Sequence, residues 1–172
     1  VDLIRDGVDC VVRAGLTVDD SLVARPLVQM DQVTCASPAY LQAHGVPHSL
    51  DDLSGHQVVE YFSSVSGKRY GLEFQADDGV RLLDLPKRLA VNSAEGYLAA
   101  CVAGYGLVQT PHYHAAQLLR EGRLQEVLSD CLAPRLALTA LYPQHRQLSP
   151  RLRVFVDWLV DLCARPGSGF RR

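Results

Sequence analysis

The sequence predicts an α/β fold with partly parallel sheets, and three observations carry this prediction. Segments with strand patterning alternate along the chain with segments of helical patterning, which is the order expected of βαβ units. The 172 residues are 48% hydrophobic, enough for the packed core of one domain or two small lobes. Charged residues make up 21% of the chain, as is usual for a globular protein.

Strand signals open the chain. Residues 9–13 are apolar in the middle and end before a glycine, which indicates a short strand. Residues 22–36 are too long for one strand, and Pro26 and the step from Met30 to Asp31 favour two strands with a bend.

A helix is expected to begin after Ser37. This serine can cap the exposed amides, and Pro38 suits the first helical position because its missing N–H would be unpaired there. Gly45 ends the helix, since glycine accepts the left-handed conformation without steric cost. Residues 51–53 predict one further helical turn.

The middle of the chain predicts strands and a hairpin. The strands are residues 57–62 and 89–91. The hairpin joins residues 70–75 and 80–85 through a turn at 77–79.

The clearest helix of the central region begins at Asn92 or Ser93. Glu95 lies three residues after Asn92, as in a capping box, and apolar residues then recur at helical spacing up to Gly104. The remaining elements are a strand at 106–110, a helix at 115–120, strands at 124–128 and 136–142, and a long amphipathic helix from Ser149.

Charge and cysteine usage exclude some classes of protein. Seventeen Lys and Arg against nineteen Asp and Glu give a net charge of −2, whereas nucleic-acid-binding modules are usually basic. No run of 18 apolar residues occurs and no signal-peptide pattern is visible, so we expect no membrane contact. The five cysteines are widely spaced and mostly lie among apolar residues. This favours reduced, buried thiols in a cytoplasmic protein over a disulfide framework or a zinc site.

Common catalytic motifs are absent from the sequence. There is no G-x-S-x-G elbow, Walker loop, H-E-x-x-H or G-x-G-x-x-G, and we therefore predict no enzyme, no metal and no cofactor. The H-x-H pair at His112 and His114 lacks an apparent third ligand, so a turn that faces solvent or a ligand is favoured over a metal site.

Candidate binding residues follow from the fold, because ligands of α/β proteins bind at the carboxyl ends of strands and at helix N-termini. Arg13 ends a strand and can hold a carboxylate or form a structural ion pair. Asn92 and Ser93 can seat an anion or merely cap their helix. Tyr61 and Ser63 can form a pocket wall, or a core contact and a turn.

An ordered set of motifs resembles the LysR-type transcriptional regulators. Residues 2–15 are similar to the family's DLI-x-x-GVD-x-x-[IV]R-x-G segment, and residues 33–41 to its V-x-ASPAYL signature. Further matches lie at residues 44–47, 50–56, 91–93, 104–111 and 148–159. The resemblance covers nearly the whole chain.

The resemblance implies an effector-binding domain with a two-lobed, type 2 periplasmic-binding-protein-like fold, mixed sheets, crossing strands and an effector in the cleft between the lobes. The expected first lobe is residues 1–55 and 136–165, the second is 56–135, and 166–172 form a flexible tail. We expect the first lobe to be incomplete, because its first strand and helix, like the family's helix-turn-helix, have no counterpart in this sequence.

The resemblance also implies partners and site residues. By position, the effector-facing residues are Ser37, Tyr61, Ser63, Asn92, Ser93, Thr110 and Arg13. The effector would be a small molecule, and an anionic metabolite or an aromatic acid suits a helix start together with Arg13. DNA would be bound only through the missing N-terminal domain, and the regulator would be a homodimer or homotetramer. A free-standing solute-binding receptor of the same fold is the alternative.

Overall fold

A computed structural model of the chain describes residues 7–15, 21–64, 67–144, 149–165 and 170. The chain divides into two compact units. The first unit comprises Val1–Asp31 and Arg135–Arg172, and the second comprises Gln32–Pro134. This grouping differs from the expected lobes, which placed residues 32–55 in the first one. These residues belong to the second unit because they supply its central strand and part of its core. The expected tail at 166–172 lies outside the described residues, apart from residue 170.

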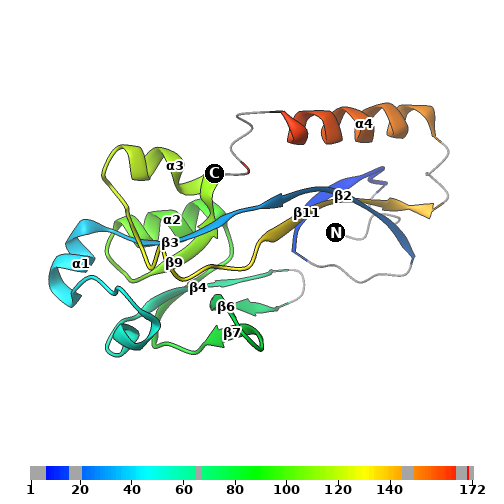
Figure 1. Cartoon of the computed structure of the whole chain (residues 1–172). Helices are drawn as coiled ribbons and strands as arrows, with labels where there is room; N and C mark the ends of the chain where they lie inside the picture. Colours follow the sequence, from blue (N-terminus) through cyan, green and yellow to red (C-terminus); the bar gives the residue numbers. More distant parts are fainter. Residues whose placement is uncertain (1–6, 16–20, 65–66, 145–148, 166–169, 171–172) are drawn as a thin grey trace. The chain divides into compact units, whose positions relative to one another are not determined.

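The first unit is a three-stranded antiparallel sheet with one helix. Its strands, in sheet order, are β1 (Val11–Ala14), β11 (Leu136–Pro143) and β2 (Leu22–Met30). The helix α4 (Pro150–Ala164) packs against β2 (Figure 1). The β2 strand continues through Pro26, because its pairing with β11 shifts by one residue there, and the break falls at Asp31.

The second unit contains two three-stranded sheets and a hairpin. The first sheet has the order β10 (Gln125–Val127), β3 (Gln32–Ala36) and β9 (Val108–Pro111). The second has the order β5 (Arg69–Tyr70), β4 (Val58–Phe62) and β8 (Lys87–Val91). The hairpin pairs β6 (Leu72–Ala76) with β7 (Gly79–Leu83).

Strand direction decides which residues meet in this unit. β4 and β8 are parallel, and a parallel bridge between Val58 and Leu107 places the start of β9 beside the start of β4. β3 is antiparallel to β9. The carboxyl ends of β4, β8 and β9 therefore lie at one edge, and the carboxyl end of β3 lies at the opposite edge.

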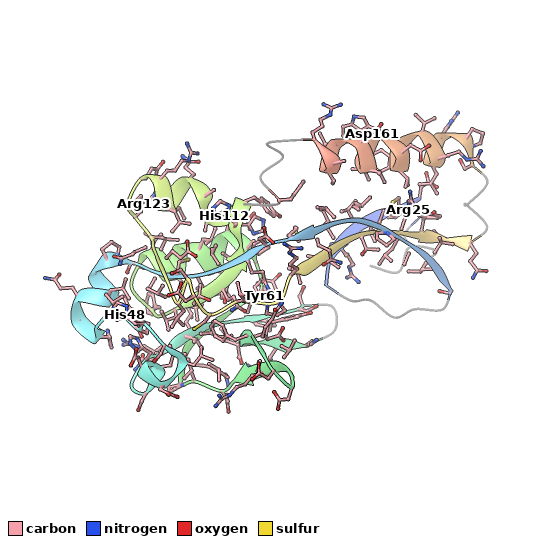
Figure 2. The ribbon with its side chains drawn as sticks, in the orientation of Figure 1. Arg25, His48, Tyr61, His112, Arg123 and Asp161 are labelled. Carbon is pink, nitrogen blue, oxygen red and sulfur yellow. The ribbon has the colours of Figure 1, made fainter. Side chains whose placement is uncertain are left out.

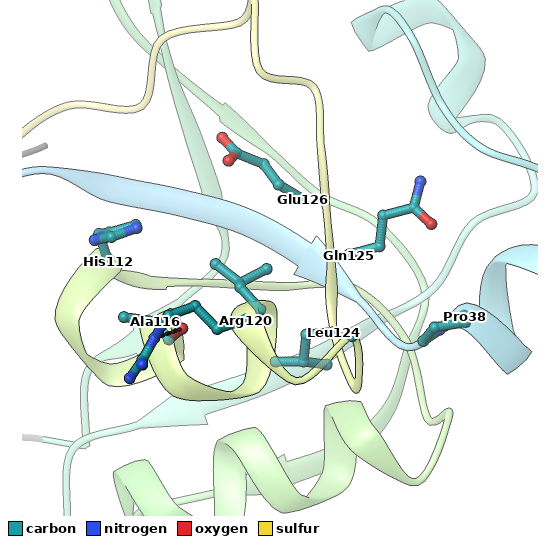
Figure 3. Close-up of a pocket in the computed structure, with 9 residues that line it drawn as sticks. Pro38, His112, Ala116, Arg120, Leu124, Gln125 and Glu126 are labelled. Carbon is teal, nitrogen blue, oxygen red and sulfur yellow. Dashed lines mark hydrogen bonds between the residues drawn. The ribbon is translucent and has the colours of Figure 1, made fainter.

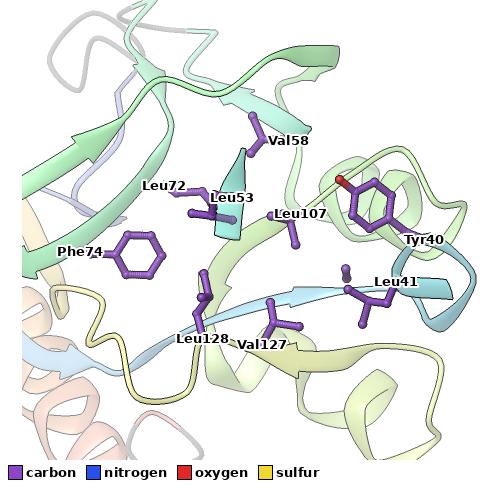
Figure 4. Close-up of a cluster of buried hydrophobic side chains, with 10 residues drawn as sticks. Tyr40, Leu41, Leu53, Val58, Leu72, Phe74, Leu107, Val127 and Leu128 are labelled. Atoms are coloured by element: carbon purple, nitrogen blue, oxygen red, sulfur yellow. The ribbon is translucent and has the colours of Figure 1, made fainter. Parts of the chain in front are cut away.

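Helices cover both faces of the first sheet of the second unit. They are α1 (Pro38–His44), the 3-10 turn η1 (Leu50–Leu53), α2 (Ala94–Val102) and α3 (His112–Arg120). Side chains alternate along a strand, so Val33 and Cys35 pack against α2 and α3, while Ala36 packs into a second cluster with Tyr40 and Leu107 (Figure 4).

Helix starts agree only in part with the sequence patterns. Ser37 caps α1 as predicted, and its hydroxyl accepts a hydrogen bond from the Tyr40 amide. The capping box expected at Asn92 is wrong: Ser93 is the cap of α2 and accepts from the Gly96 amide, so Glu95 stands one position too early. The helix α3 begins directly after Pro111, three residues before the expected start.

Gly106 sets the join between the two sheets of the second unit. Its φ is +147°, and a Cβ atom there would lie 2.5 Å from the backbone oxygen of Gln57. The adjacent Leu107 amide donates to that same oxygen at 2.8 Å. Only glycine therefore lets β9 approach the start of β4 this closely.

The five cysteines form no disulfide, and Cys35, Cys101 and Cys163 are buried. The structure therefore does not contain the disulfide framework that was the alternative. Among the described residues, no helix is both long and apolar enough to cross a membrane.

Candidate functional site

Five of the predicted site residues lie at the edge where β4, β8 and β9 end. Tyr61 is in register with Val91, so the end of β4 lies beside the residues that follow β8. Thr110 lies near the end of β9. We call this group the strand-end edge, and it consists of Tyr61, Ser63, Asn92, Ser93 and Thr110.

Aromatic rings form the wall of the strand-end edge. The half-buried ring of Tyr61 lies 5.9 Å from that of Tyr70, and 5.7 Å, edge to face, from that of Tyr97 (Tyr61 is labelled in Figure 2). The Tyr97 hydroxyl accepts a hydrogen bond from the Gln109 amide at 3.2 Å, which ties α2 to β9. Burial raises the pKa of Tyr97, so this hydroxyl is neutral at physiological pH.

Thr110 is the most informative residue of the edge. It is only 4% exposed, yet its hydroxyl makes no hydrogen bond with any described residue. Thr34, on the neighbouring strand, is equally buried, and its hydroxyl accepts a hydrogen bond from the Gln109 side chain at 3.2 Å. The Thr110 oxygen is not among the fully buried atoms that lack a partner. The unpaired hydroxyl is therefore accessible at the edge, where a ligand or water can bond it.

Asn92 and Ser93 have different roles. The Ser93 hydroxyl is occupied by the Gly96 amide and is therefore a structural cap. Asn92 is exposed, and its side chain makes no hydrogen bond with any described residue. Glu95 already places a carboxylate in the first turn of α2, so the predicted seat for an anion at this helix start is weakened.

Sequence patterns missed two residues that shape this edge, Tyr97 and Gln109, and identified a third, His114, only as part of the H-x-H turn. Tyr97 was expected only as part of the apolar stripe of its helix, although a hydroxyl in such a stripe needs a hydrogen-bond partner. Gln109 bonds both the amide and the carbonyl of Glu73, which holds β6 to β9. His114 lies in the first turn of α3, and burial lowers its pKa, while the nearby Glu95 acts in the opposite direction.

The other two predicted site residues lie elsewhere. Ser37 follows β3, which runs opposite to β9, and a Cβ atom on Gly104, just past the end of α2, would lie 3.7 Å from the Ser37 hydroxyl. Ser37 is thus at the opposite edge from the start of α2 and is not part of the strand-end edge. Arg13 lies half-buried on β1 in the first unit, in register with Thr139, and its role stays a prediction.

The H-x-H pair gains no further ligands in the structure. Within the described ranges, no group of three or more His, Cys, Asp or Glu side chains is placed to hold a metal ion.

Comparison with known protein families gives one match over most of the chain. Residues 1–164 match the family model described as the LysR substrate binding domain. The structure of the regulatory domain of CrgA, a LysR-type transcriptional regulator from Neisseria meningitidis, superposes with a TM-score of 0.77 at 29% identity. That likeness covers 94% of this chain and 78% of that one. It confirms the predicted α/β fold of the type 2 periplasmic-binding-protein class.

Curated relatives carry the names of transcriptional regulators. The chain is 43% identical over 162 residues to the HTH-type transcriptional regulator YhjC of Escherichia coli (strain K12), covering 94% of this chain and 54% of that protein. It is 31% identical over 171 residues to an HTH-type transcriptional repressor of Pseudomonas aeruginosa (strain UCBPP-PA14), covering 95% and 51%. The chain thus spans about half the length of these relatives, whose names do not favour the free-standing receptor.

Proposed function

The chain belongs to the family of LysR substrate-binding domains, and we propose that it is the effector-sensing part of a DNA-binding transcriptional regulator. The match of the family model over residues 1–164 carries this proposal. The DNA contacts would come from the part of the regulator that corresponds to the unmatched half of the relatives. The net charge of −2 of this chain fits such a division of roles. The role is sensing and not catalysis, in a homodimer or homotetramer.

The proposed mechanism is a shift between conformations of the regulator. An effector that binds one conformation more tightly raises its population, and the attached DNA-binding domains then sit differently on DNA. The free energy available for this shift is the difference between the effector's affinities for the two conformations.

We propose the strand-end edge as the part of the second unit that contacts the effector. The unpaired hydroxyl of Thr110 and the free amide of Asn92 would bond its polar groups, and Tyr61 would pack against its ring. An aromatic acid suits this combination better than an aliphatic anion. The support is the Tyr61 ring at this edge, since aromatic rings pack against one another with favourable energy.

A ligand screen on the chain tests the site. Aromatic acids and aliphatic acids of similar size are added singly, and the rise in melting temperature is measured, because a bound ligand stabilises the folded state by mass action. Asn92→Ala should keep the melting temperature and lose the response to the best acid. Gln42→Ala removes another exposed amide, on α1, and should keep the response. An undiminished response in Asn92→Ala would remove Asn92 from the site.

The function itself is tested on the full-length regulator. Binding to the promoter DNA of its own gene is measured by gel shift, with and without the best acid of the screen. A changed affinity or band pattern is expected. Absence of DNA binding by the full-length protein would overturn the assignment as a regulator.

A further inference from the structure

A pocket of about 700 Å³ lies in the second unit and extends from His112, just after the end of β9, along α3 to Arg120. It is an open groove along one face of α3, bordered on the other side by β10 and the chain before it (Figure 3). Ala116 and Leu119 of α3 and Leu124 before β10 give it apolar walls. Its volume is in the range of pockets that hold small molecules. None of its lining residues belongs to the strand-end edge.

Polar groups without partners line the same pocket. The Nδ1 atom of His112 is buried and has no hydrogen-bond partner in the part of the chain that the structure describes. Buried polar atoms without a hydrogen-bond partner are rare in native proteins, so a partner from outside the chain is expected. His112 is also the first residue of α3, which has no side-chain cap and no acidic residue in its first turn. The helix start therefore places a partial positive charge at this end of the pocket.

Arg120 adds a full positive charge to this pocket. It lies two turns after His112 on the same helix face, and its Nε donates to the Ala116 carbonyl at 3.4 Å, so the side chain folds back toward the start of α3. No carboxylate among the described residues forms an ion pair with it. Arg123, just beyond the helix, is by contrast paired with Glu121.

We propose that this pocket is a second ligand site, which binds a small carboxylic acid with an apolar body. The carboxylate would accept hydrogen bonds from Arg120 and His112, and the apolar body would cover Ala116, Leu119 and Leu124. Glu126 lines the pocket from β10, and its negative charge would keep the carboxylate of the ligand at the Arg120 and His112 side. A neutral molecule of the same shape would bind more weakly, because it has no negative charge to pair with the Arg120 guanidinium.

Hexanoate and 1-hexanol are the probes for this site. The chain is titrated with each, and backbone amide shifts are followed by NMR. Hexanoate should shift amides between His112 and Glu126, with a Kd at least about fivefold lower than that of 1-hexanol. Equal Kd values, or hexanoate shifts confined to Asn92 and Thr110, would overturn the proposal.

Variants then locate the contacts. Arg120→Gln should weaken hexanoate binding about tenfold, since a charge-assisted hydrogen bond is lost. Arg123→Gln is the matched control and should leave the Kd unchanged. Ala116→Leu should fill the pocket and abolish binding by both probes without lowering the melting temperature. The proposal fails if Arg120→Gln and Arg123→Gln have equal effects, or if Ala116→Leu binds hexanoate as the unaltered chain does.

Discussion

Replacing Thr110 by Val asks whether its hydroxyl serves the fold or a ligand. Valine has the same shape, so the change exchanges only a hydroxyl for a methyl group. Because the Thr110 hydroxyl has no partner among the described residues, its loss should leave the free energy of unfolding unchanged or raise it by up to about 1 kcal/mol. Thr34→Val is the matched control, at the same 4% exposure. Thr34→Val removes the acceptor of a hydrogen bond from the Gln109 side-chain amide and should lower the free energy of unfolding by about 1 kcal/mol.

Thermal unfolding with and without an effector separates the two variants. For a chain of this size, about 1 kcal/mol corresponds to roughly 2–4 °C in melting temperature. An acid present at about 100 times its Kd adds roughly 2.7 kcal/mol, or about 5–10 °C. Thr110→Val should start at or above the melting temperature of the unaltered chain and lose most of this gain. Thr34→Val should start lower and keep the gain.

The opposite pattern would refute the reasoning. If Thr110→Val is less stable than Thr34→Val, the Thr110 hydroxyl has a structural partner and its unpaired state is no sign of a ligand. If Thr110→Val keeps the full response to the acid, the hydroxyl does not contact the effector, even if the fold is unaffected.

Three further outcomes are expected from the described contacts, each measured by thermal melts. His56 is buried and bonded to Tyr40, and burial lowers its pKa, with His44 adding to the effect and Asp52 opposing it. The unfolded chain therefore binds more protons below about pH 6.5, so stability should fall as the pH drops from there, and His56→Gln should flatten the profile between about pH 7 and 5. Gly106→Ala should cost more than about 3 kcal/mol through the clash with Gln57, whereas Gly122→Ala, with open space around it, should cost about 1 kcal/mol. Ser37→Ala should cost about 1 kcal/mol as a lost helix cap and leave the ligand response intact, and a lost response would return Ser37 to the site.

Local signals in the sequence were sufficient for most helices and strands. The serine and proline before α1 predict its start because capping and a fixed proline φ act within a few residues. The capping box at Asn92 failed for a related reason: two adjacent residues can cap, and the tertiary contacts of Tyr97 with β9 decide which one does. The early start of α3 was missed because an apolar stripe marks only the buried part of a helix, and its first turn carries His112, Tyr113 and His114.

The lobe boundary required information that no local pattern contains. The resemblance to the LysR-type regulators placed residues 32–55 in the first lobe. Their partners are distant in sequence: β3 pairs with β9 and β10, and Tyr40 and Leu53 pack with Leu107 and Val127. Burial of these residues against a core some 60 residues further along the chain, and not chain continuity, sets the unit to which they belong.

Strand direction explains why Thr110 and Ser37 lie at opposite edges, although each lies at the end of an apolar strand. In a parallel sheet the rule that ligands lie at the carboxyl ends of strands selects one edge, and β4, β8 and β9 all end at the same edge. β3 enters the second unit from Asp31 and runs antiparallel to β9, with Cys35 opposite Val108, so the residue after it faces the other edge. For β3 the residue at the strand-end edge is therefore the first one, Gln32, which pairs with Pro111, and not Ser37 after its last one.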